Sequence, residues 1–252
     1  MGRPNSQELI ALSDFLYTFL PGLNAEFAAL QLSLAYETCA LITLLAVVGL
    51  LFAEWRQIAL GRWLFKPVAS LGFILAAWLL DPLSSSYGSY IFLGLILSMI
   101  GDVCLIPQGS GKIFLLGVGS FLLAHVAYTA AFFFVAFHPA GLFGVLVPMS
   151  AIAFFIYKWL SPDVPDKLQK PILGYVIVIT FMVSISIAVV IAQPDFQYLA
   201  VAATLFWLSD ISVARARFKQ ADFFNKVWGI PFYFGAQLLF ALTVVHGVQM
   251  QP

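Results

Sequence analysis

Residues 172–192 read ILGYVIVITFMVSISIAVVIA, a run of twenty-one residues without a charged side chain. A helix needs about 20 predominantly apolar residues to cross the roughly 30 Å hydrocarbon core of a bilayer. A run of this length is typical of a transmembrane helix rather than of a helix in a soluble core. This stretch therefore predicts a membrane-spanning helix and decides the class of fold.

Seven further apolar runs occur on both sides of this stretch. The chain is 62% hydrophobic and 10% charged, whereas soluble domains carry roughly 25% charged residues. We therefore predict an all-α integral membrane protein with about eight transmembrane helices. The other predicted spans are Cys39–Phe52, Pro67–Leu80, Tyr90–Ile106, Ile113–Phe137, Gly141–Trp159, Tyr198–Val213 and Val227–Val245.

Basic residues alternate between successive predicted loops. Loops one, three, five and seven hold eleven of the twelve Lys and Arg, and only Arg3 lies elsewhere. Because cytoplasmic loops carry an excess of Lys and Arg, this pattern predicts both termini on the non-cytoplasmic side. The compact, sparsely charged outer loops favour a bacterial inner membrane, with an endoplasmic-reticulum membrane as the alternative.

The first thirty-six residues precede the apolar core of the chain. Between Leu9 and Leu20 apolar residues recur at helical spacing, with Asp14 among them and Glu8 directly before them. Such a pattern is typical of a helix that lies at the membrane surface. We therefore predict an interfacial segment over residues 1–36 and a transmembrane domain over residues 37–252.

The two halves of the chain resemble each other. Lys66-Pro67 and Lys170-Pro171 stand at the starts of spans two and six, 104 residues apart, where a proline favours the first helical turn. Gly101-Asp102 and Ser209-Asp210 close spans three and seven, 108 residues apart. We therefore predict two parallel four-helix repeats related by an axis along the membrane normal, as in some transporters.

Asp102 and Asp210 are the most informative residues. A carboxylate in a lipid-facing helix costs at least about 2.5–3.5 kcal/mol, so both must face the bundle interior or water. One interpretation is that each caps a helix or pairs with a nearby cation, Lys112, Arg215 or Arg217. The other is a matched pair, in which one carboxyl keeps its proton because two cannot both ionise cheaply at low dielectric. Such a pair provides the acid and the base that acid-catalysed hydrolysis needs.

Other polar residues lie inside apolar spans. His125 and Tyr128 share a face of span four, and Tyr233 and Gln237 share a face of span eight. They indicate either hydrogen bonds between helices or contacts with a substrate. From the rise per residue we expect His125 to lie roughly 10 Å deeper than Asp102, lining a cavity rather than touching the carboxylates.

Cations, cysteines and histidines narrow the chemistry further. Lys66 and Lys170 indicate either ordinary anchoring at the cytoplasmic face or a phosphate site. Two cysteines far apart predict neither a disulfide framework nor a metal motif, and three histidines at different depths make a zinc site improbable. We predict no metal and no cofactor, and the net charge of zero does not imply nucleic acid.

Five short motifs, in their order along the chain, resemble the lysoplasmalogenase family, the YhhN-like eight-span membrane proteins. The resemblance runs from about Lys66 to Leu239. The motifs are Lys66-Pro67, Ser98-Met99-Ile100-Gly101-Asp102, Phe121-Leu122-Leu123-Ala124-His125-Val126-Ala127-Tyr128, Leu208-Ser209-Asp210 and Tyr233-Phe234-Gly235-Ala236-Gln237-Leu238.

The resemblance implies hydrolysis of the vinyl ether bond of lysoplasmalogens to a fatty aldehyde and glycerophosphocholine or glycerophosphoethanolamine. On that basis Asp102 and Asp210 form the catalytic pair, and the partners are a lysophospholipid substrate and membrane lipid. The predicted substrate-binding residues are Lys66, His125, Tyr128, Lys170, Tyr175, Ser209, Tyr233 and Gln237.

Two alternatives remain open. Parallel repeats with interior polar residues are also typical of a membrane transporter, here of a small amphiphile. Two membrane aspartates also suit an intramembrane aspartyl protease, although Met99 stands where the protease pattern Gly-x-Gly-Asp has glycine.

Overall fold

The computed structural model describes residues 32–107 and 111–249, which form eight long helices and no strand. All eight are long and apolar enough to cross a membrane, so the predicted all-α fold with eight spans is confirmed. The helices are Leu32–Trp55, α2 (Ala59–Leu79), α3 (Ser86–Cys104), α4 (Gly111–Phe132), α5 (Pro139–Leu160), α6 (Asp166–Ala192), α7 (Gln197–Phe218) and α8 (Phe223–Gln249).

Several helices extend beyond the predicted spans. α2 begins at Ala59 and α6 at Asp166, so Pro67 and Pro171 lie inside helices and the prediction that they begin them is wrong. Membrane helices tolerate internal proline because neighbouring groups satisfy the freed backbone. The first helix already begins at Leu32, whereas the predicted surface helix of residues 9–20 lies outside the described residues.

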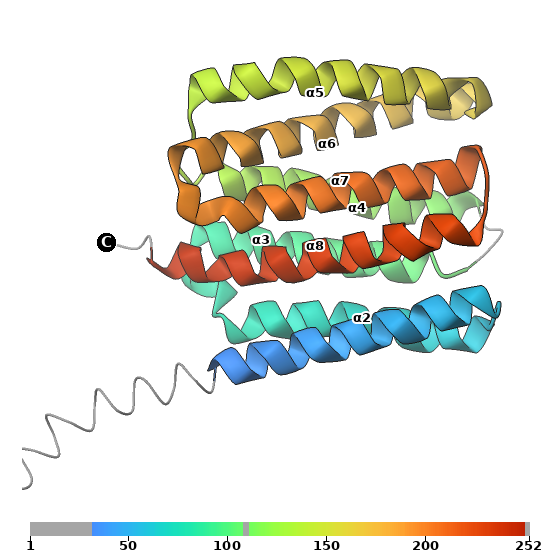
Figure 1. The fold of residues 1–252 in the computed structure, drawn as a ribbon, viewed down its shortest axis with the longest axis horizontal. Helices are drawn as coiled ribbons and strands as arrows, with labels where there is room; N and C mark the ends of the chain where they lie inside the picture. Colours follow the sequence, from blue (N-terminus) through green and yellow to red (C-terminus); the bar gives the residue numbers. More distant parts are fainter. Residues whose placement is uncertain (1–31, 108–110, 250–252) are drawn as a thin grey trace, which may run out of the picture.

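Successive helices run antiparallel, so every second connection lies at the same end of the bundle (Figure 1). We call one end the basic end: there α3, α5 and α7 end and α4, α6 and α8 begin. The first helix also turns into α2 at this end. Both ends of the described chain lie at the opposite end of the bundle (Figure 1).

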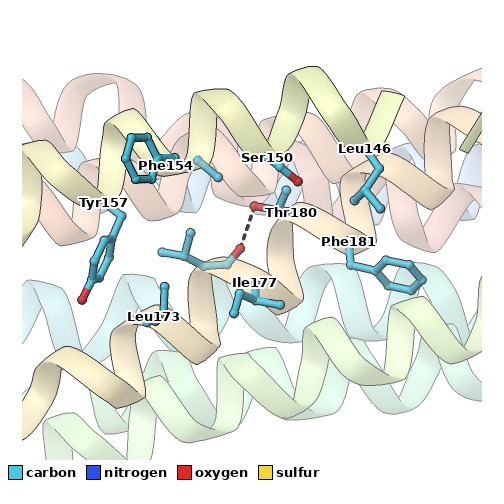
Figure 2. A pocket seen from close by; sticks show the side chains of 10 residues that line it. Leu146, Ser150, Phe154, Tyr157, Leu173, Ile177, Thr180 and Phe181 are labelled. Carbon is cyan, nitrogen blue, oxygen red and sulfur yellow. Dashed lines mark hydrogen bonds between the residues drawn. The ribbon is translucent and has the colours of Figure 1, made fainter. Parts of the chain in front are cut away.

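Helix packing is similar in the two halves. α3 packs along α4 as α7 packs along α8, and α2 contacts α8 as α6 contacts α4. The α3–α4 contact in the first half therefore corresponds to the α7–α8 contact in the second, and the α2–α8 contact corresponds to the α6–α4 contact. The predicted parallel repeat requires this correspondence. α5 departs from this core: only Ala153 and Leu160 are buried on it, and a cavity lies between it and α6 (Figure 2).

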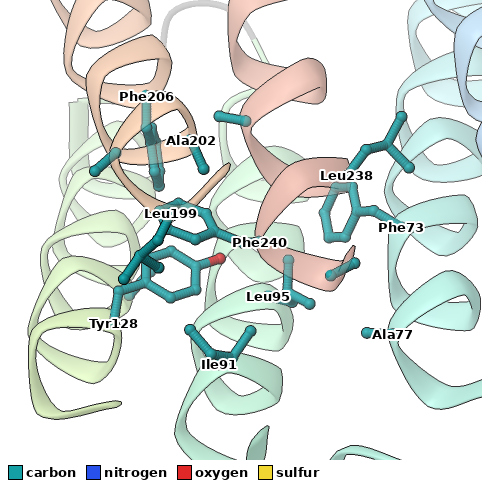
Figure 3. Close-up of a cluster of buried hydrophobic side chains, with 14 of the residues drawn as sticks. Phe73, Ala77, Ile91, Leu95, Tyr128, Leu199, Ala202, Phe206, Leu238 and Phe240 are labelled. Carbon is teal, nitrogen blue, oxygen red and sulfur yellow. The ribbon is translucent and has the colours of Figure 1, made fainter. Parts of the chain in front are cut away.

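Aromatic rings from α4, α7 and α8 fill the core beside α3 (Figure 3). The Tyr128 ring stacks on Phe240 with centroids 4.1 Å apart. A Cβ added at Gly94 would come within 2.3 Å of Tyr128, and one at Gly101 within 2.7 Å of Phe121. The two glycines are seven residues apart, hence on one face of α3, and let α4 approach closely. This close approach brings Asp102, which follows Gly101, beside the core.

Candidate active site

A cavity of about 550 Å³ opens near the basic end and is lined by residues from all eight helices. Asp102 and Asp210 both lie on its wall, among mostly apolar side chains. Four cationic side chains also line it, all close to the helix ends there: Arg62, Lys66, Arg217 and Lys226. The cavity thus joins a charged mouth to an apolar interior that contains two carboxyl groups.

Asp102 is 1% exposed and lies among three hydrogen-bond donors. Ser70 Oγ and Tyr233 OH donate to its Oδ2 over 2.7 and 2.6 Å. Lys66 Nζ lies 3.2 Å from its Oδ1. An ammonium group has no lone pair, so Oδ1 must act as an acceptor there. These partners stabilise the ionised form of Asp102 against the cost of its burial.

The donors of Asp102 come from two helices that border α3. Lys66 and Ser70 are four residues apart on α2 and therefore share a face, whereas Tyr233 comes from α8. The Asp102 carboxylate thereby joins α2, α3 and α8. Removing one partner alone from an ion pair this deep strongly destabilises the protein, because the other charge stays buried.

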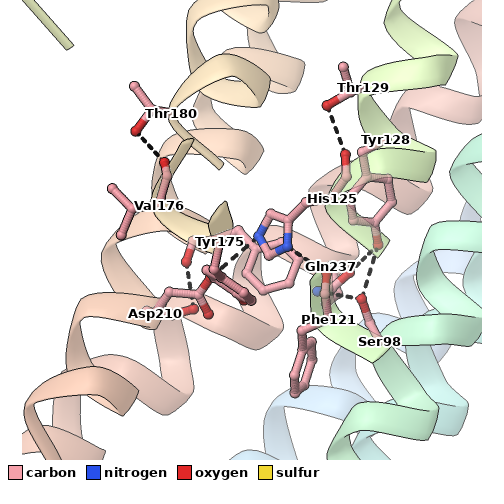
Figure 4. A network of polar contacts seen from close by, with 12 residues as sticks. Ser98, Phe121, His125, Tyr128, Thr129, Tyr175, Val176, Thr180, Asp210 and Gln237 are labelled. Atoms are coloured by element: carbon pink, nitrogen blue, oxygen red, sulfur yellow. Dashed lines mark hydrogen bonds and ion pairs between the residues drawn. The ribbon is translucent and has the colours of Figure 1, made fainter. Parts of the chain in front are cut away.

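Asp210 has a different set of partners, shown in Figure 4. Tyr175 OH donates to its Oδ2 over 2.7 Å, and His125 Nε2 lies 3.3 Å from the same oxygen. His125 Nδ1 lies 2.5 Å from the Phe121 carbonyl oxygen, which accepts only, so Nδ1 carries a hydrogen. Nε2 forms no hydrogen bond there, and its contact with Asp210 is an ion pair only when the imidazole is protonated.

His125 Nε2 faces Asp210 Oδ2 and has no hydrogen-bond partner among the described residues. The side chain of Asp210 is 18% exposed, so this pair reaches the cavity wall. A proton held at this contact would join the two groups and lie within reach of a molecule in the cavity.

No hydrogen bond or ion pair joins the two carboxyl groups in the described part of the chain. Aromatic rings lie between their two sets of partners: Tyr233 contacts Phe206 at 5.5 Å between centroids, and Phe206 contacts His125 at 4.4 Å. His125 and Tyr233 are 108 residues apart, as are Asp102 and Asp210. Asp102 in the first half therefore contacts Tyr233 of the second half, and Asp210 in the second half contacts His125, the corresponding residue of the first half.

His125 differs from the sequence expectation. It contacts Asp210 and is fully buried, and it does not line the cavity. The expectation of a large depth difference rested on Asp102, which lies near the end of α3. Asp210 instead has eight further residues of α7 after it, roughly 12 Å of helix, so it lies deep enough to meet His125.

Tyr128 and Gln237 are fully buried and outside the cavity wall. Tyr128 OH donates to Gln237 Oε1 over 2.6 Å, and Gln237 Nε2 lies 3.4 Å from Ser98 Oγ (Figure 4). These bonds join α3, α4 and α8. Tyr128 and Gln237 thus form a hydrogen bond between helices, one of the two interpretations of these residues in the sequence analysis.

Of the remaining predicted site residues, four line the cavity and one does not. Lys66, Tyr175, Ser209 and Tyr233 line the cavity, and Ser209 Oγ donates to the Phe206 carbonyl oxygen over 2.7 Å. Lys170 is exposed and is not part of the wall. Among the described residues Lys66 forms an ion pair with a carboxylate, whereas Lys170, its counterpart in the predicted repeat, forms none.

Sequence reasoning missed several residues at this site. Ser70 follows Lys66 by one helical turn, a spacing that points to a shared partner. Glu54 lies at the end of the first helix and forms ion pairs with Arg62 at 3.5 Å and with Lys226. A carboxylate at the end of an apolar span was the signal for this network, which closes part of the cavity mouth.

Arg215, one candidate partner of the site aspartates, is engaged elsewhere. It forms an ion pair with Asp222 at 3.2 Å and also contacts Asn225. The Asn225 backbone N–H donates to Asp222 and, with Arg215, holds the pKa of that carboxyl below its usual range. Arg215 thus secures the turn between α7 and α8 and leaves Asp210 to His125 and Tyr175.

The fold and the site define a multi-pass membrane protein with a carboxylate-lined cavity inside its helix bundle. A model of the YhhN family matches residues 61–244. The chain belongs to the YhhN family, which confirms the resemblance found in its motifs. Two relatives named lysoplasmalogenase TMEM86A, from Bos taurus and Homo sapiens, are each 30% identical to it over 189 residues, 73% of either chain. No solved structure matches the chain.

Proposed function

We propose that this protein is a lysoplasmalogenase, a hydrolase that cleaves the vinyl ether bond of lysoplasmalogens. The observation that supports this most is that one cavity holds two carboxyl groups with different partners: Asp102 lies beside Lys66, and Asp210 lies beside His125, whose imidazole can hold a transferable proton. The names of its relatives point to the same reaction.

The reaction begins with proton transfer to carbon. The Asp210–His125 pair gives its proton to the β-carbon of the vinyl ether, and the C=C electron pair forms the new C–H bond. The carbon next to the ether oxygen is left as an oxocarbenium ion. Tyr175 holds the Asp210 oxygen in place through its hydrogen bond. General acid catalysis of this kind contributes typically 10²–10⁴-fold.

Water then completes the hydrolysis. It adds to the oxocarbenium carbon and returns a proton to the Asp210–His125 pair, which gives a hemiacetal. The bond to the glycerol oxygen breaks as the hemiacetal proton moves to that oxygen, releasing a fatty aldehyde and the glycerophospho-alcohol. The ionised Asp102 stabilises the cation and helps to activate the water, a division of roles also used by paired carboxylates at glycosidic centres.

The substrate and the membrane orientation follow from the same site. A lysophospholipid places its headgroup at the water interface and its chain in lipid, which matches a cavity with a charged mouth and an apolar interior. The Lys and Arg at the basic end favour the cytoplasmic side for that mouth, with both termini on the other side of a bacterial inner membrane. Accessibility labelling of single cysteines at both ends tests this orientation.

The direct test is aldehyde release by the purified protein in detergent. Lysoplasmenylcholine and lysoplasmenylethanolamine should both give aldehyde, and acyl lysophospholipids should give none. Asp210→Asn should stop turnover while the protein still elutes as a folded particle. A folded wild-type protein that releases no aldehyde from either headgroup class would refute the proposal and favour a transporter.

A further inference from the structure

Three of the four cations that line the cavity form ion pairs with carboxylates. Arg62 and Lys226 pair with Glu54, and Lys66 pairs with Asp102. Arg217 is the exception, because no ion pair is found for it within residues 32–107 and 111–249. Its guanidinium carbon lies 4.2 Å from the centroid of the Phe114 ring. A stacked guanidinium keeps its hydrogen-bond donors free for an anion.

Arg217 also lies at a suitable distance from the acid. It follows Asp210 by seven residues, which puts both on one face of α7, roughly 10 Å apart along the helix axis. In a lysoplasmalogen, seven bonds separate the β-carbon of the vinyl ether from phosphorus, roughly 8–9 Å at the reach per bond of an extended chain. A substrate protonated at Asp210 thus brings its phosphate near Arg217.

We propose that Arg217 binds the phosphodiester of the substrate headgroup, an inference that rests on the proposed function. Arg binds phosphate oxygens through two parallel hydrogen bonds, which fixes orientation as well as charge. The site assigns this role to Arg217 rather than to Lys66, whose charge is taken up by Asp102, or to Lys170, which lies off the cavity wall.

The test compares two substrates, lysoplasmenylcholine and the phosphate-free 1-alkenylglycerol. Arg217→Gln should raise KM for lysoplasmenylcholine roughly tenfold or more, as expected for the loss of charge-assisted hydrogen bonds, and leave KM for the alkenylglycerol within about twofold. Arg217→Lys should recover part of the loss. Arg56→Gln is the matched control, since Arg56 also lies over an aromatic ring, Trp55, but off the cavity wall.

Equal effects of Arg217→Gln on both substrates, or no effect on either, would overturn the phosphate site. An arginine that only anchors the protein at lipid headgroups gives one of these two results. A wild-type protein inactive towards both substrates would instead refute the proposed function, so the two failures are distinguishable.

A second inference comes from the cavity between α5 and α6 (Figure 2). It has a volume of about 400 Å³, and its wall is apolar except for Ser150, Tyr157 and Thr180. The Thr180 hydroxyl donates to the Val176 carbonyl oxygen over 2.6 Å, so it needs no further partner. This is a surface suited to a hydrocarbon chain.

This second cavity adjoins the first. Ala153 and Val176 belong to the walls of both, and Val176 follows Tyr175, the residue that donates to Asp210. The alkenyl chain leaves the reacting carbon on the side opposite to the glycerol. We infer that the α5–α6 cavity holds the alkenyl chain of the substrate, which again rests on the proposed function.

Blocking the shared wall tests this inference. Ala153→Phe, with Val176→Phe as a second variant, should lower kcat/KM at least about tenfold for a long-chain lysoplasmalogen and much less for one with a four-carbon alkenyl chain. Leu123→Phe, on an exposed face of α4 outside both cavities, is the control. Folded Ala153 and Val176 variants with equal loss at both chain lengths, or no loss, would refute the inference.

Discussion

Asp102 and Asp210 occupy corresponding places in the two halves of the bundle, yet their surroundings differ. Asp102 is met by an ammonium and two hydroxyl groups, and its side chain is 2% exposed. Asp210 is met by an imidazole and one hydroxyl group, and its side chain is 18% exposed. The change of the cationic partner from lysine to histidine matters most, because only imidazole exchanges its proton readily near neutral pH.

This difference gives the two carboxyl groups different properties, although they come from corresponding helices of the two halves. A lysine–carboxylate pair holds a fixed charge, whereas a histidine–carboxylate pair holds a transferable proton. Among the described residues no Lys or Arg forms an ion pair with Asp210, whose partner is His125. The account therefore expects different results when each carboxyl group or its partner is changed.

The largest effect is expected for Asp210→Asn. This substitution keeps the shape of the side chain but removes the carboxyl group that carries or relays the proton. We expect kcat for aldehyde release to fall by about 10³–10⁴-fold, the upper part of the range for a general acid. Turnover of a folded variant within tenfold of the wild type would contradict the assignment of the acid.

The second-largest effect is a loss of stability when Asp102 loses its cationic partner, Lys66. Lys66→Met leaves a buried carboxylate without its cation, which should lower the free energy of unfolding by about 3–5 kcal/mol. The measurement is thermal unfolding in detergent, followed by loss of the folded elution peak.

The double variant Lys66→Met/Asp102→Asn serves as the control for that experiment. It removes both charges together and should recover most of the lost stability. Equal destabilisation in the single and the double variant would show that Lys66 acts through packing rather than through the charge of Asp102.

A smaller effect is expected for Tyr175→Phe. The variant loses one hydrogen bond to Asp210 of about 1.5–3 kcal/mol, so kcat should fall roughly ten- to a hundredfold while KM stays nearly constant. Tyr198→Phe, on an exposed face of α7 outside both cavities, is the matched control and should keep kcat. A rise in KM without a change in kcat would make Tyr175 a substrate contact instead.

The smallest effect is expected for Tyr128→Phe. Its hydrogen bond to Gln237 joins helices outside the cavity, and such bonds contribute roughly 0.6–2 kcal/mol in membranes. We expect a slightly lower midpoint of thermal unfolding and an unchanged kcat. A strong loss of kcat at unchanged stability would show that Tyr128 takes part in the reaction and is not only a structural residue.

Much of this architecture is readable from the sequence because membrane solvation dominates it. Apolar runs such as residues 172–192 and the placement of Lys and Arg leave little freedom in the number of spans. Helix ends were harder to predict: Pro67 suggests a helix start, but α2 already begins at Ala59, since proline inside a membrane helix is tolerated.

The site was only partly readable, for a geometric reason. Asp102 and Asp210 stand out because a carboxylate in lipid demands a partner. Which partner each one finds depends on tilt and depth, which the spacing of residues along the chain does not determine. His125 was therefore placed too far from Asp210, and Ser70 was missed although it shares a helix face with Lys66.

The measurement that tests the central claim most directly is hydrolysis of lysoplasmenylcholine in D₂O, with the aldehyde trapped as it forms. Protonation of the vinyl ether by the Asp210–His125 pair predicts one deuterium on the carbon next to the aldehyde carbonyl. An aldehyde released without deuterium at that carbon would contradict acid-catalysed cleavage, and with it the role given to Asp210.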